Sequence, residues 1–349
     1  GLIENKTNNV PRLDWLNSDC PSLLLEPQRT NNLKYSEDLT NSVWSLLSAG
    51  TGVNPIVTAN YSIAPNGTLT ADRVVLNQGS GTSNNDYSII RQVVSSVGQG
   101  ISSVYMKSNT NNDYVISIDE LGTGIKNVTV TNQWQRFEYS ETTNDRLQLS
   151  LRGNTNSNYA DISVWGTQME VGSYPTSYIK TEASTVTRLK DFISGGGNAN
   201  LFNSLEGTFF VQMASFLNAQ TNSNGIELSD SSGQNRVTIQ YDTPNNQIRG
   251  DIRVSSVAQA IFTTGFYDVK NFNKIAVTYK YNEAKLYVNG SLIGTDTSVN
   301  IFAEDTLTEV RSTIAGISAD AFNLQAKIKD LKVYDRVLTE AEAIELTTL

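Results

Sequence analysis

The sequence predicts an all-β protein made of two antiparallel β-sandwiches in tandem, followed by a short C-terminal helix. Its 349 residues suggest two domains at about 150 residues each. The chain is rich in Asn, Ser, Thr and Gly, and only 17% of its residues are charged, a composition that suits short strands and turns better than long helices. Short runs of alternating apolar and polar residues recur along both halves, with no helical pattern between them.

Residues 1–30 predict an extended N-terminal arm. Three prolines interrupt any helix in this segment: Pro11, Pro21 and Pro27. Its apolar residues, such as Trp15 and the run 23–25, are too numerous for a free tail. We therefore expect the arm to bury these side chains against the domain that follows or against a neighbouring subunit.

Residues 31–187 predict the first sandwich domain. Its alternating runs read as strands at residues 71–76, 87–93, 101–106, 114–118, 128–130, 134–139, 147–151 and 162–165. Residues 188–204 then predict a linker. We expect the three adjacent glycines 195–197 within it to form a turn, because such a run rarely lies inside a strand and no lysine or helix start follows it.

Residues 205–349 predict the second sandwich domain. Its strands are expected at residues 208–213, 225–228, 236–241, 247–252, 274–279, 285–288, 291–293 and 326–334. Asn289-Gly290 lies between two of them and predicts a type I′ hairpin turn. Thr339 is expected to cap a helix over 340–346, with Glu342 completing a capping box.

The composition excludes several kinds of chemistry. With no histidine, the chain has no Ser-His-Asp or Cys-His machinery and no His-ligated metal. The single cysteine, Cys20, forms neither an internal disulfide nor a thiolate metal site, and we expect it to be a small, at least partly buried apolar residue. A net charge of −9 argues against nucleic acid, and no apolar stretch is long enough to span a membrane. Because Gly1 follows no Met or leader, we expect a processed piece of a longer protein.

The second half resembles the concanavalin-like (laminin-G-like) jelly roll. The resemblance covers residues 247–349 and rests on the segments 276–279, 286–290 and 328–339. Where that family often has Trp-His before the Ala-Val-Thr strand, this chain has Phe272-Asn273-Lys274. This departure leaves the fold unaffected and weakens the inference of a shared ligand.

The first half is similar to modules of bacteriophage virion proteins that are related to carbohydrate-binding jelly rolls. The segments that carry this resemblance are 11–15, 20–31, 35–38, 64–72, 165–170 and 174–179. It implies a virion surface protein, either a head-fibre (capsid fibre) or decoration protein or a tail-fibre component. It also implies other virion proteins as partners, a homotrimer, and host attachment through surface polysaccharide.

Carboxylates in catalytic arrangements are missing from the sequence pattern. Asp119 and Glu120 are adjacent on a strand and therefore point to opposite faces, whereas a glycoside hydrolase needs two converging carboxyl groups. Residues 205–349 lack the Glu-x-Asp-x-x-Glu run of concanavalin-like hydrolases. We therefore expect a non-enzymatic protein. The alternatives are a polysaccharide depolymerase on the second jelly roll and a secreted bacterial glycan-binding adhesin.

Aromatic side chains are the candidate sugar contacts. Trp134 and Trp165 lie in alternating strands beside Phe137 and Val164 and are expected to pack inside. Tyr241 and Tyr267, closer to turns, are therefore the ligand-binding candidates. Because related jelly rolls often hold a structural calcium ion, we also considered oxygen ligands for one. These are Asp72, Asp161, Glu170, Asp230 and Asp296, none of which has a definite ligand spacing.

Overall fold

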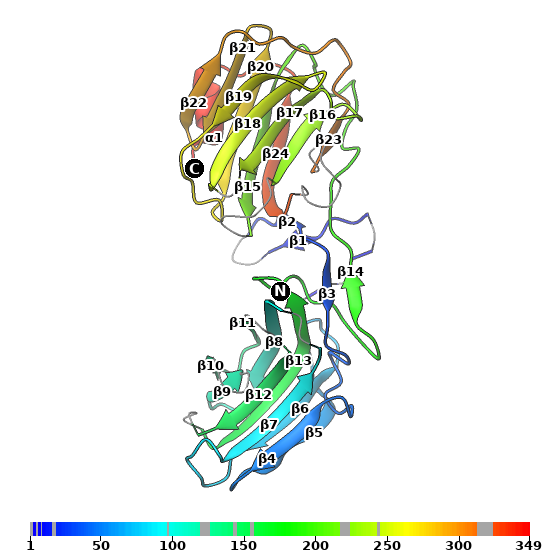
Figure 1. Ribbon diagram of the computed structural model, residues 1–349, viewed down its shortest axis with the longest axis vertical. Coiled ribbons are helices and arrows are strands. Elements are labelled where there is room, and N and C mark those ends of the chain that lie inside the picture. The colour runs from blue at the N-terminus through cyan, green and yellow to red at the C-terminus, as the bar shows by residue number, and fades with distance from the viewer. Residues whose placement is uncertain are drawn as a thin grey trace. The chain divides into compact units, whose positions relative to one another are not determined.

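The computed structural model divides the chain into two units, one inserted into the other. The described residues are 3, 4, 6, 7, 9–15, 19–95, 98–118, 126–141, 145–153, 157–216, 224–242, 245–312 and 324–349. The first unit comprises Gly1–Asn5 and Gln28–Leu189, and the second comprises Lys6–Pro27 and Lys190–Leu349 (Figure 1). After the first five residues, which belong to the first unit, the chain thus enters the second unit, returns to build the first, and then completes the second.

The first unit is a sandwich of two five-stranded antiparallel sheets. One sheet has the order β10 (Lys126–Val130), β9 (Tyr114–Ile118), β12 (Arg146–Arg152), β7 (Tyr87–Val93) and β4 (Ser45–Ala49). The other has the order β11 (Gln135–Glu141), β8 (Gly100–Ser108), β13 (Tyr159–Val171), β6 (Ala71–Asn77) and β5 (Val53–Ser62). Alternation explains the core between them: on β6, Val74 and Leu76 are fully buried, whereas Arg73 faces the other way.

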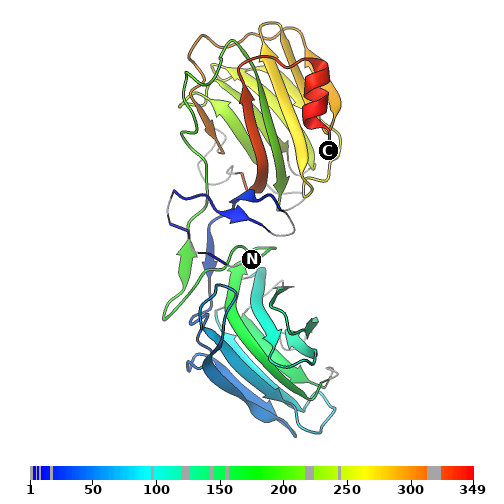
Figure 2. The same cartoon turned by 180° about the vertical axis from the view of Figure 1, so that it is seen from behind.

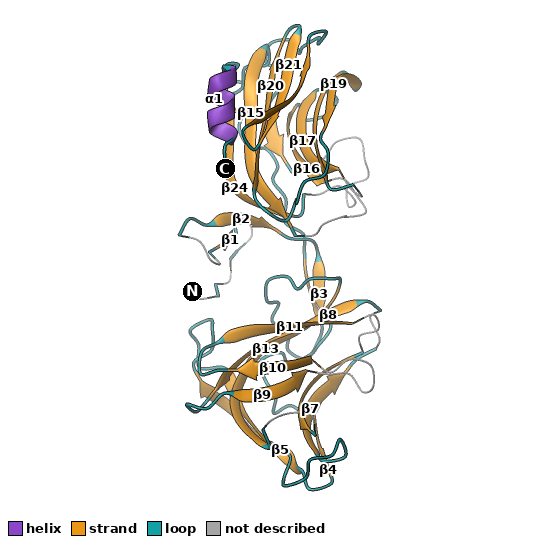
Figure 3. Cartoon of the chain, turned by 90° about the vertical axis from the view of Figure 1, so that its left-hand side faces the viewer, coloured by secondary structure: helices purple, strands orange, loops and turns teal. Residues whose placement is uncertain are grey.

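The second unit is also an antiparallel sandwich, whose two sheets form separate layers in Figure 3. The seven-stranded sheet has the order β1 (Leu13–Asp14), β2 (Ser22–Leu25), β24 (Ala326–Tyr334), β15 (Glu206–Ser215), β20 (Asn273–Lys280), β21 (Glu283–Val288) and β22 (Ser291–Asp296). The five-stranded sheet has the order β19 (Val257–Thr263), β18 (Gln247–Val254), β17 (Arg236–Asp242), β16 (Asn224–Ser229) and β23 (Glu309–Arg311). A continuous apolar core lies between the two sheets. The predicted all-β sandwich fold is confirmed.

Two local predictions are confirmed at the C-terminal end. Asn289 and Gly290 adopt positive φ angles of 48° and 79° and join β21 to β22. Helix α1 (Glu340–Thr347) begins after Thr339, which forms a capping box with Glu342. The helix lies against the outer face of the seven-stranded sheet, where Ala343 packs with Phe210 and Tyr287 (Figure 2).

The N-terminal segment differs from the separate arm expected over residues 1–30. Its β2 pairs with β24, with Leu23 opposite Ile328, and Leu25 enters the core of the second unit. Arg12 fixes the segment further, since its guanidinium binds the carboxylates of Glu26 and Asp191. Leu25 is therefore buried, but in the domain farther along the sequence, whereas Trp15, which was also expected to be buried, is 58% exposed in this chain.

The segment 188–204 also differs from the expected linker. β14 (Val186–Arg188) pairs with β3 (Arg29–Asn31) in the first unit. Within the second unit, the Gly196 N–H donates to Val310 and Phe202 is buried in the core. Gly197 has φ of 99°, and a Cβ there would lie 2.2 Å from the Phe202 ring, so the glycine run makes a packed turn rather than a flexible joint.

Two further sequence-based expectations meet the structure here. Cys20 is exposed, so the expectation that it is at least partly buried is wrong. The reason is its position in the connection before β2, where the backbone turns at the surface. No helix among the described residues is long and apolar enough to span a membrane.

Candidate binding face on the first unit

The outer face of the sheet β11-β8-β13-β6-β5 is covered along part of its length. Trp165 on β13 lies beneath Tyr178, with ring centroids 4.5 Å apart, and beside Tyr105, with centroids 5.5 Å apart. The Trp165 indole N–H donates to the Thr70 hydroxyl at 3.1 Å. The expectation that Trp165 is buried is confirmed, while Trp134 is partly buried against the same cluster.

The remaining part of this outer face carries two half-exposed tyrosines around an ion pair. Arg73 donates two hydrogen bonds to the Asp161 carboxylate, at 2.9 and 2.5 Å. The Tyr61 ring lies 5.3 Å from the Arg73 guanidinium, and Tyr159 begins the same strand as Asp161. Tyr61 and Tyr159 are 48% and 46% exposed. We call Tyr61, Arg73, Tyr159 and Asp161 the tyrosine–arginine strip.

The electrostatics keep this pair charged. The hydrogen bond to Asp161 raises the pKa of Arg73, against the opposing effect of burial, and the nearby Tyr61 and Tyr159 hydroxyls raise it further. The same hydrogen bond lowers the pKa of Asp161, with a smaller contribution from the Asn109 amide. At neutral pH Asp161 therefore stays ionised and holds Arg73 in place, which leaves it no proton to donate as a general acid.

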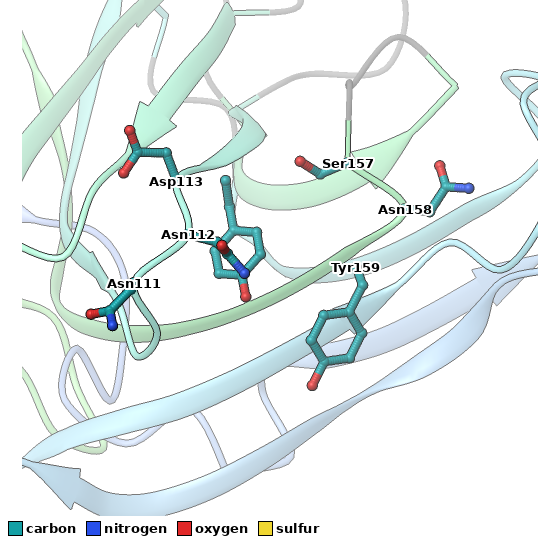
Figure 4. Close-up of a pocket in the computed structure, with 7 residues that line it drawn as sticks. Asn111, Asn112, Asp113, Ser157, Asn158 and Tyr159 are labelled. Atoms are coloured by element: carbon teal, nitrogen blue, oxygen red, sulfur yellow. The ribbon is translucent and has the colours of Figure 1, made fainter.

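Beside the strip lies an open polar hollow of about 700 Å³. One wall is formed by Asn111, Asn112, Asp113 and Tyr114, and the other by Ser157, Asn158 and Tyr159 (Figure 4). Tyr159 belongs to both the hollow and the strip. Among the described residues, the side chains of Asn111, Asn112, Asp113 and Asn158 have no hydrogen-bond partner.

The loop that forms the first wall is held firmly. The Ser108 hydroxyl bonds to the Asn112 carbonyl at 2.7 Å, and the Thr110 hydroxyl lies 3.0 Å from that of Tyr114. Asn109 donates from its amide to Asp161 at 2.9 Å and accepts from Ser163 at 2.6 Å. These bonds fix the backbone of the loop, while its outer side chains have no hydrogen-bond partner among the described residues.

The arrangement suits a polyhydroxylated ligand better than an apolar one. Amide groups both donate and accept hydrogen bonds, as sugar hydroxyls do, and Asp113 adds an acceptor. The Tyr159 ring offers an apolar surface next to them. Small-molecule pockets are usually lined mainly by apolar groups, so a shallow hollow lined by amides and hydroxyls indicates hydroxyl recognition.

The two tyrosines chosen from the sequence lie elsewhere, in the second unit. Tyr241 is 1% exposed, and its hydroxyl donates to the Met213 carbonyl at 2.7 Å inside the core. The prediction of Tyr241 as a surface contact is therefore wrong: the residue falls on the inward face of β17. Tyr267 is partly buried against the same core, which leaves it a poor platform for a sugar.

The five acids considered as calcium ligands are not brought together. Each accepts hydrogen bonds from a protein donor nearby: Leu39 for Asp72, Arg73 for Asp161, Thr176 for Glu170, Asn235 for Asp230 and Ser298 for Asp296. Burial raises the pKa of Asp72, although the backbone N–H groups of Asn60 and Leu39 oppose this. Within the part of the chain that is described, no three Cys, Asp or Glu side chains form a metal-binding group.

Asp119 and Glu120 lie outside the described residues. The residues of the hollow and of the tyrosine–arginine strip were missed by sequence reasoning, apart from Asp161, which was considered only as a calcium ligand. One signal was present: the segment 109–113 contains three asparagines and an aspartate between two strands. Tyr61 reaches Arg73 from an irregular stretch of the β5–β6 pairing, between Thr58 and Ser62, and this irregularity leaves no mark in the sequence.

Comparison with known proteins supports the fold of the second unit. Residues 208–343 match the family described as the concanavalin A-like lectin/glucanases superfamily. This part of the chain is therefore similar to concanavalin-like (laminin-G-like) domains, as the sequence pattern indicated. No curated protein matches the chain.

Solved structures with similar folds cover less than half of the chain. The CBM40 module of the Ruminococcus gnavus IT-sialidase, bound to α2,3-sialyllactose, is 17% identical, with a TM-score of 0.36 over 45% of this chain and 97% of that one. The heptameric SAP-like pentraxin of Limulus polyphemus is 13% identical, with a TM-score of 0.35 over 42% and 70%. The leech intramolecular trans-sialidase is 16% identical, with a TM-score of 0.36 over 46% and 27%. These are distant, partial likenesses.

Proposed function

We propose that this protein is a non-catalytic, glycan-binding component of a bacteriophage virion surface, and that its first unit binds the glycan. The observation that carries the binding proposal is the polar hollow with its unpaired amide side chains and the half-exposed Tyr159. Such a site matches hydroxyl groups on one side and a sugar ring face on the other. The concanavalin A-like lectin/glucanase match of the second unit is consistent with this class of ligand.

Attachment without turnover is supported by the state of the carboxylates. In the hollow and strip, Asp161 is held in an ion pair, which leaves Asp113 as the one carboxylate there without a partner among the described residues. On the second unit, the buried acids Glu227 and Asp251 are each held by arginines. A glycoside hydrolase needs one carboxyl group to deliver a proton and a second to act as base or nucleophile. The hydrogen bond from Arg73 lowers the pKa of Asp161 and so opposes its protonation.

The virion setting rests on the resemblance of the first half to phage virion modules. A shallow hollow binds a single glycan weakly. Many copies on one particle, or three chains in a homotrimer, raise the avidity by orders of magnitude without any new contact. Immunogold labelling of intact particles tests the location: label on the capsid or tail supports it, and particles without label contradict it. Sedimentation of the purified chain tests the trimer, which a monomer mass at all concentrations excludes.

Binding to immobilised glycans tests the function directly. Tyr159→Ala removes the ring shared by the hollow and the strip, and should weaken binding by about tenfold, the loss expected when one stacked ring is removed. Tyr281→Ala is the matched control, because Tyr281 is 63% exposed but lies in the second unit. Equal binding by wild type and Tyr159→Ala contradicts the assignment of the face.

Product analysis distinguishes the depolymerase alternative. Incubation with a bound polysaccharide should release no new reducing or unsaturated ends. Ends that appear with wild type and disappear with Glu227→Gln or Asp251→Asn would establish an enzyme instead.

A further inference from the structure

The outer face of the five-stranded sheet of the second unit carries an arginine-rich cluster. Strand alternation sends Ile226, Leu228 and their neighbours into the core, so the residues between them point to the opposite face. Cross-strand pairing aligns these outward residues: Arg311 is opposite Glu227, and Arg236 is opposite Arg253. We call the following residues the arginine cluster: Glu227, Arg236, Arg249, Asp251, Arg253 and Arg311.

Two buried carboxylates organise the four guanidinium groups. Glu227 is fully buried and binds Arg311 at 2.5 Å, while the Arg236 Nε lies 3.8 Å from it. Asp251 receives both of its arginines on one oxygen: the Oδ2 atom lies 3.0 Å from Arg253 and 3.3 Å from Arg249. With four cations around two anions, the cluster has an excess of positive charge in a chain whose net charge is −9. Glu309, 3.6 Å from Arg311, offsets part of this excess.

The cluster also leaves polar atoms unsatisfied. Among the described residues, the buried Nε atoms of Arg236 and Arg249 and the buried Nη2 atom of Arg311 have no hydrogen-bond partner. The second oxygen of Asp251, Oδ1, is also buried and has no hydrogen-bond partner, and the Asp251 side chain is only 6% exposed. Buried polar groups in folded proteins are almost always paired. Unpaired donors and an unpaired acceptor on one sheet face therefore indicate a missing partner.

The electrostatics agree with this geometry. Burial lowers the pKa of Arg236. The negative charges of Glu227 and Asp251 oppose this effect, and the positive charges of Arg253 and Arg311 lower the pKa further. Three guanidinium groups, on β17, β18 and β23, thus repel one another on one sheet face, and an anion between them removes that repulsion. Guanidinium groups also match the planar, two-oxygen geometry of carboxylates.

We propose that the arginine cluster binds the anionic group, carboxylate or sulfate, of an acidic sugar. The anionic oxygens accept from the unpaired guanidinium nitrogens, and a hydroxyl of the same sugar donates to Asp251 Oδ1. An uronic acid or a sulfated sugar carries both groups on one ring. This site is separate from the hollow of the first unit, and it relies on the proposed function only for the choice of a sugar as the carrier of the anion.

Titration of the full chain tests the proposal. The probes are an oligosaccharide containing glucuronic acid, its carboxyl-reduced neutral counterpart and a sulfated oligosaccharide of the same length. The neutral counterpart should bind at least about tenfold more weakly than the charged probes, which corresponds to the loss of one charge-assisted hydrogen bond. Affinity for the charged probes should fall as salt is raised, because ions screen the arginines. Equal affinity for the acidic and neutral probes overturns the proposal.

Two variants locate the binding. Arg236→Gln and Arg249→Gln, which each remove one of the unpaired nitrogens, should each weaken binding of the acidic probe about tenfold. Arg336→Gln removes the same charge from an exposed pair with Glu342 in the same unit. This variant should leave the affinity for the acidic probe unchanged. Unchanged binding by both cluster variants overturns the proposal. If a cluster variant fails to fold, the comparison of acidic and neutral probes on the wild-type chain still decides.

The first-unit site is tested separately. Tyr159→Ala should keep its affinity for the acidic probe while losing affinity for the neutral glycans of the first unit. If Tyr159→Ala no longer binds the acidic probe, the arginine site is contradicted and the first-unit proposal still stands. Retention of the acidic probe together with unchanged neutral binding contradicts the first-unit proposal alone.

Discussion

Single carboxylates in this protein act mainly by organising donors around them. Asp161 orients Arg73 and Asn109 beside the hollow, and Asp251 gathers two arginines on the second unit. Asp86 organises a turn in the same way, since its carboxylate accepts hydrogen bonds from the Thr51 backbone N–H at 2.9 Å and from the Ser83 hydroxyl at 2.6 Å. For Asp161 and Asp86, whose pKa values are lowered, the ionised form is the one that the surroundings stabilise.

Asp86 gives a pH-dependent prediction. Hydrogen bonds from Ser83 and Thr51 lower its pKa from 3.8 to about 2. A depressed folded-state pKa contributes stability that is fully present above the unfolded value and is lost as the pH falls towards the folded value. At pH 5 the melting temperature of the wild type should therefore be higher than that of Asp86→Asn. The difference between the two melting temperatures should shrink as the pH falls from about 4 to 2. Thermal melts over this range check it.

The control for that experiment is Asp330→Asn. Asp330 lies in the second unit and forms an exposed pair with Lys332, so its loss should leave the melting of the first unit unchanged. A wild-type advantage over Asp86→Asn that stays constant down to pH 2 contradicts the role assigned to Asp86.

Among the elements, the β21–β22 hairpin depends on one glycine. Gly290 has φ of 79°, and a Cβ there would lie 2.9 Å from the Thr348 hydroxyl. Gly290→Ala should therefore lower the free energy of unfolding by about 1 kcal/mol or more. Gly265→Ala is the matched control, because a Cβ at Gly265 meets nothing within 4 Å and its φ is not positive. Denaturant titration that gives both variants equal stability contradicts the turn assignment.

The N-terminal strands depend on Arg12. Its partner Glu26 has a side chain only 6% exposed, and Asp191 is 25% exposed. Arg12→Ala removes the cation that the two carboxylates share and should destabilise the second unit by about 2–3 kcal/mol. Arg336→Ala breaks an exposed pair in the same unit and should cost less than about 1 kcal/mol. Denaturant unfolding measures the stability of both variants. Equal losses of stability contradict the role assigned to Arg12.

Sequence patterns predicted the elements better than their partners. Alternation on β6 and the Asn289-Gly290 turn are local signals, and the structure confirms the strands and the hairpin that they predicted. The pairing of Leu23 with Ile328 joins opposite ends of the sequence, and no local pattern encodes it. Tyr241 illustrates the same limit within a strand, because its inward direction depends on register rather than on its distance from a turn.

At the scale of the whole molecule, the chain order and the domain order differ. The two ends of the first unit are paired, with Asn31 opposite Val186 and Arg29 opposite Arg188, so residues 28–189 begin and end side by side. A domain with adjacent ends and its own core is expected to fold alone. The fragment 28–189 should therefore give a cooperative melt and the far-ultraviolet spectrum of a β protein. A fragment without a cooperative transition contradicts this division.

Deletion of residues 1–27 should destabilise the second unit. The deletion removes β1 and β2 and exposes the edge of β24, an unpaired strand edge of the kind that promotes aggregation. Light scattering should report aggregates for this deletion, while the fragment 28–189 should stay dispersed. A dispersed deletion variant with unchanged stability contradicts the assignment of this segment to the second unit.

The central claim is that the first unit recognises a glycan through the hollow and the tyrosine–arginine strip. Hydrogen–deuterium exchange of the full chain, with and without a neutral oligosaccharide found to bind, locates the contact most directly. The account predicts slower exchange in the peptides that contain residues 109–114 and 157–161, with the rest of the chain unchanged. Protection confined to other segments, or no protection at saturating glycan, would contradict it.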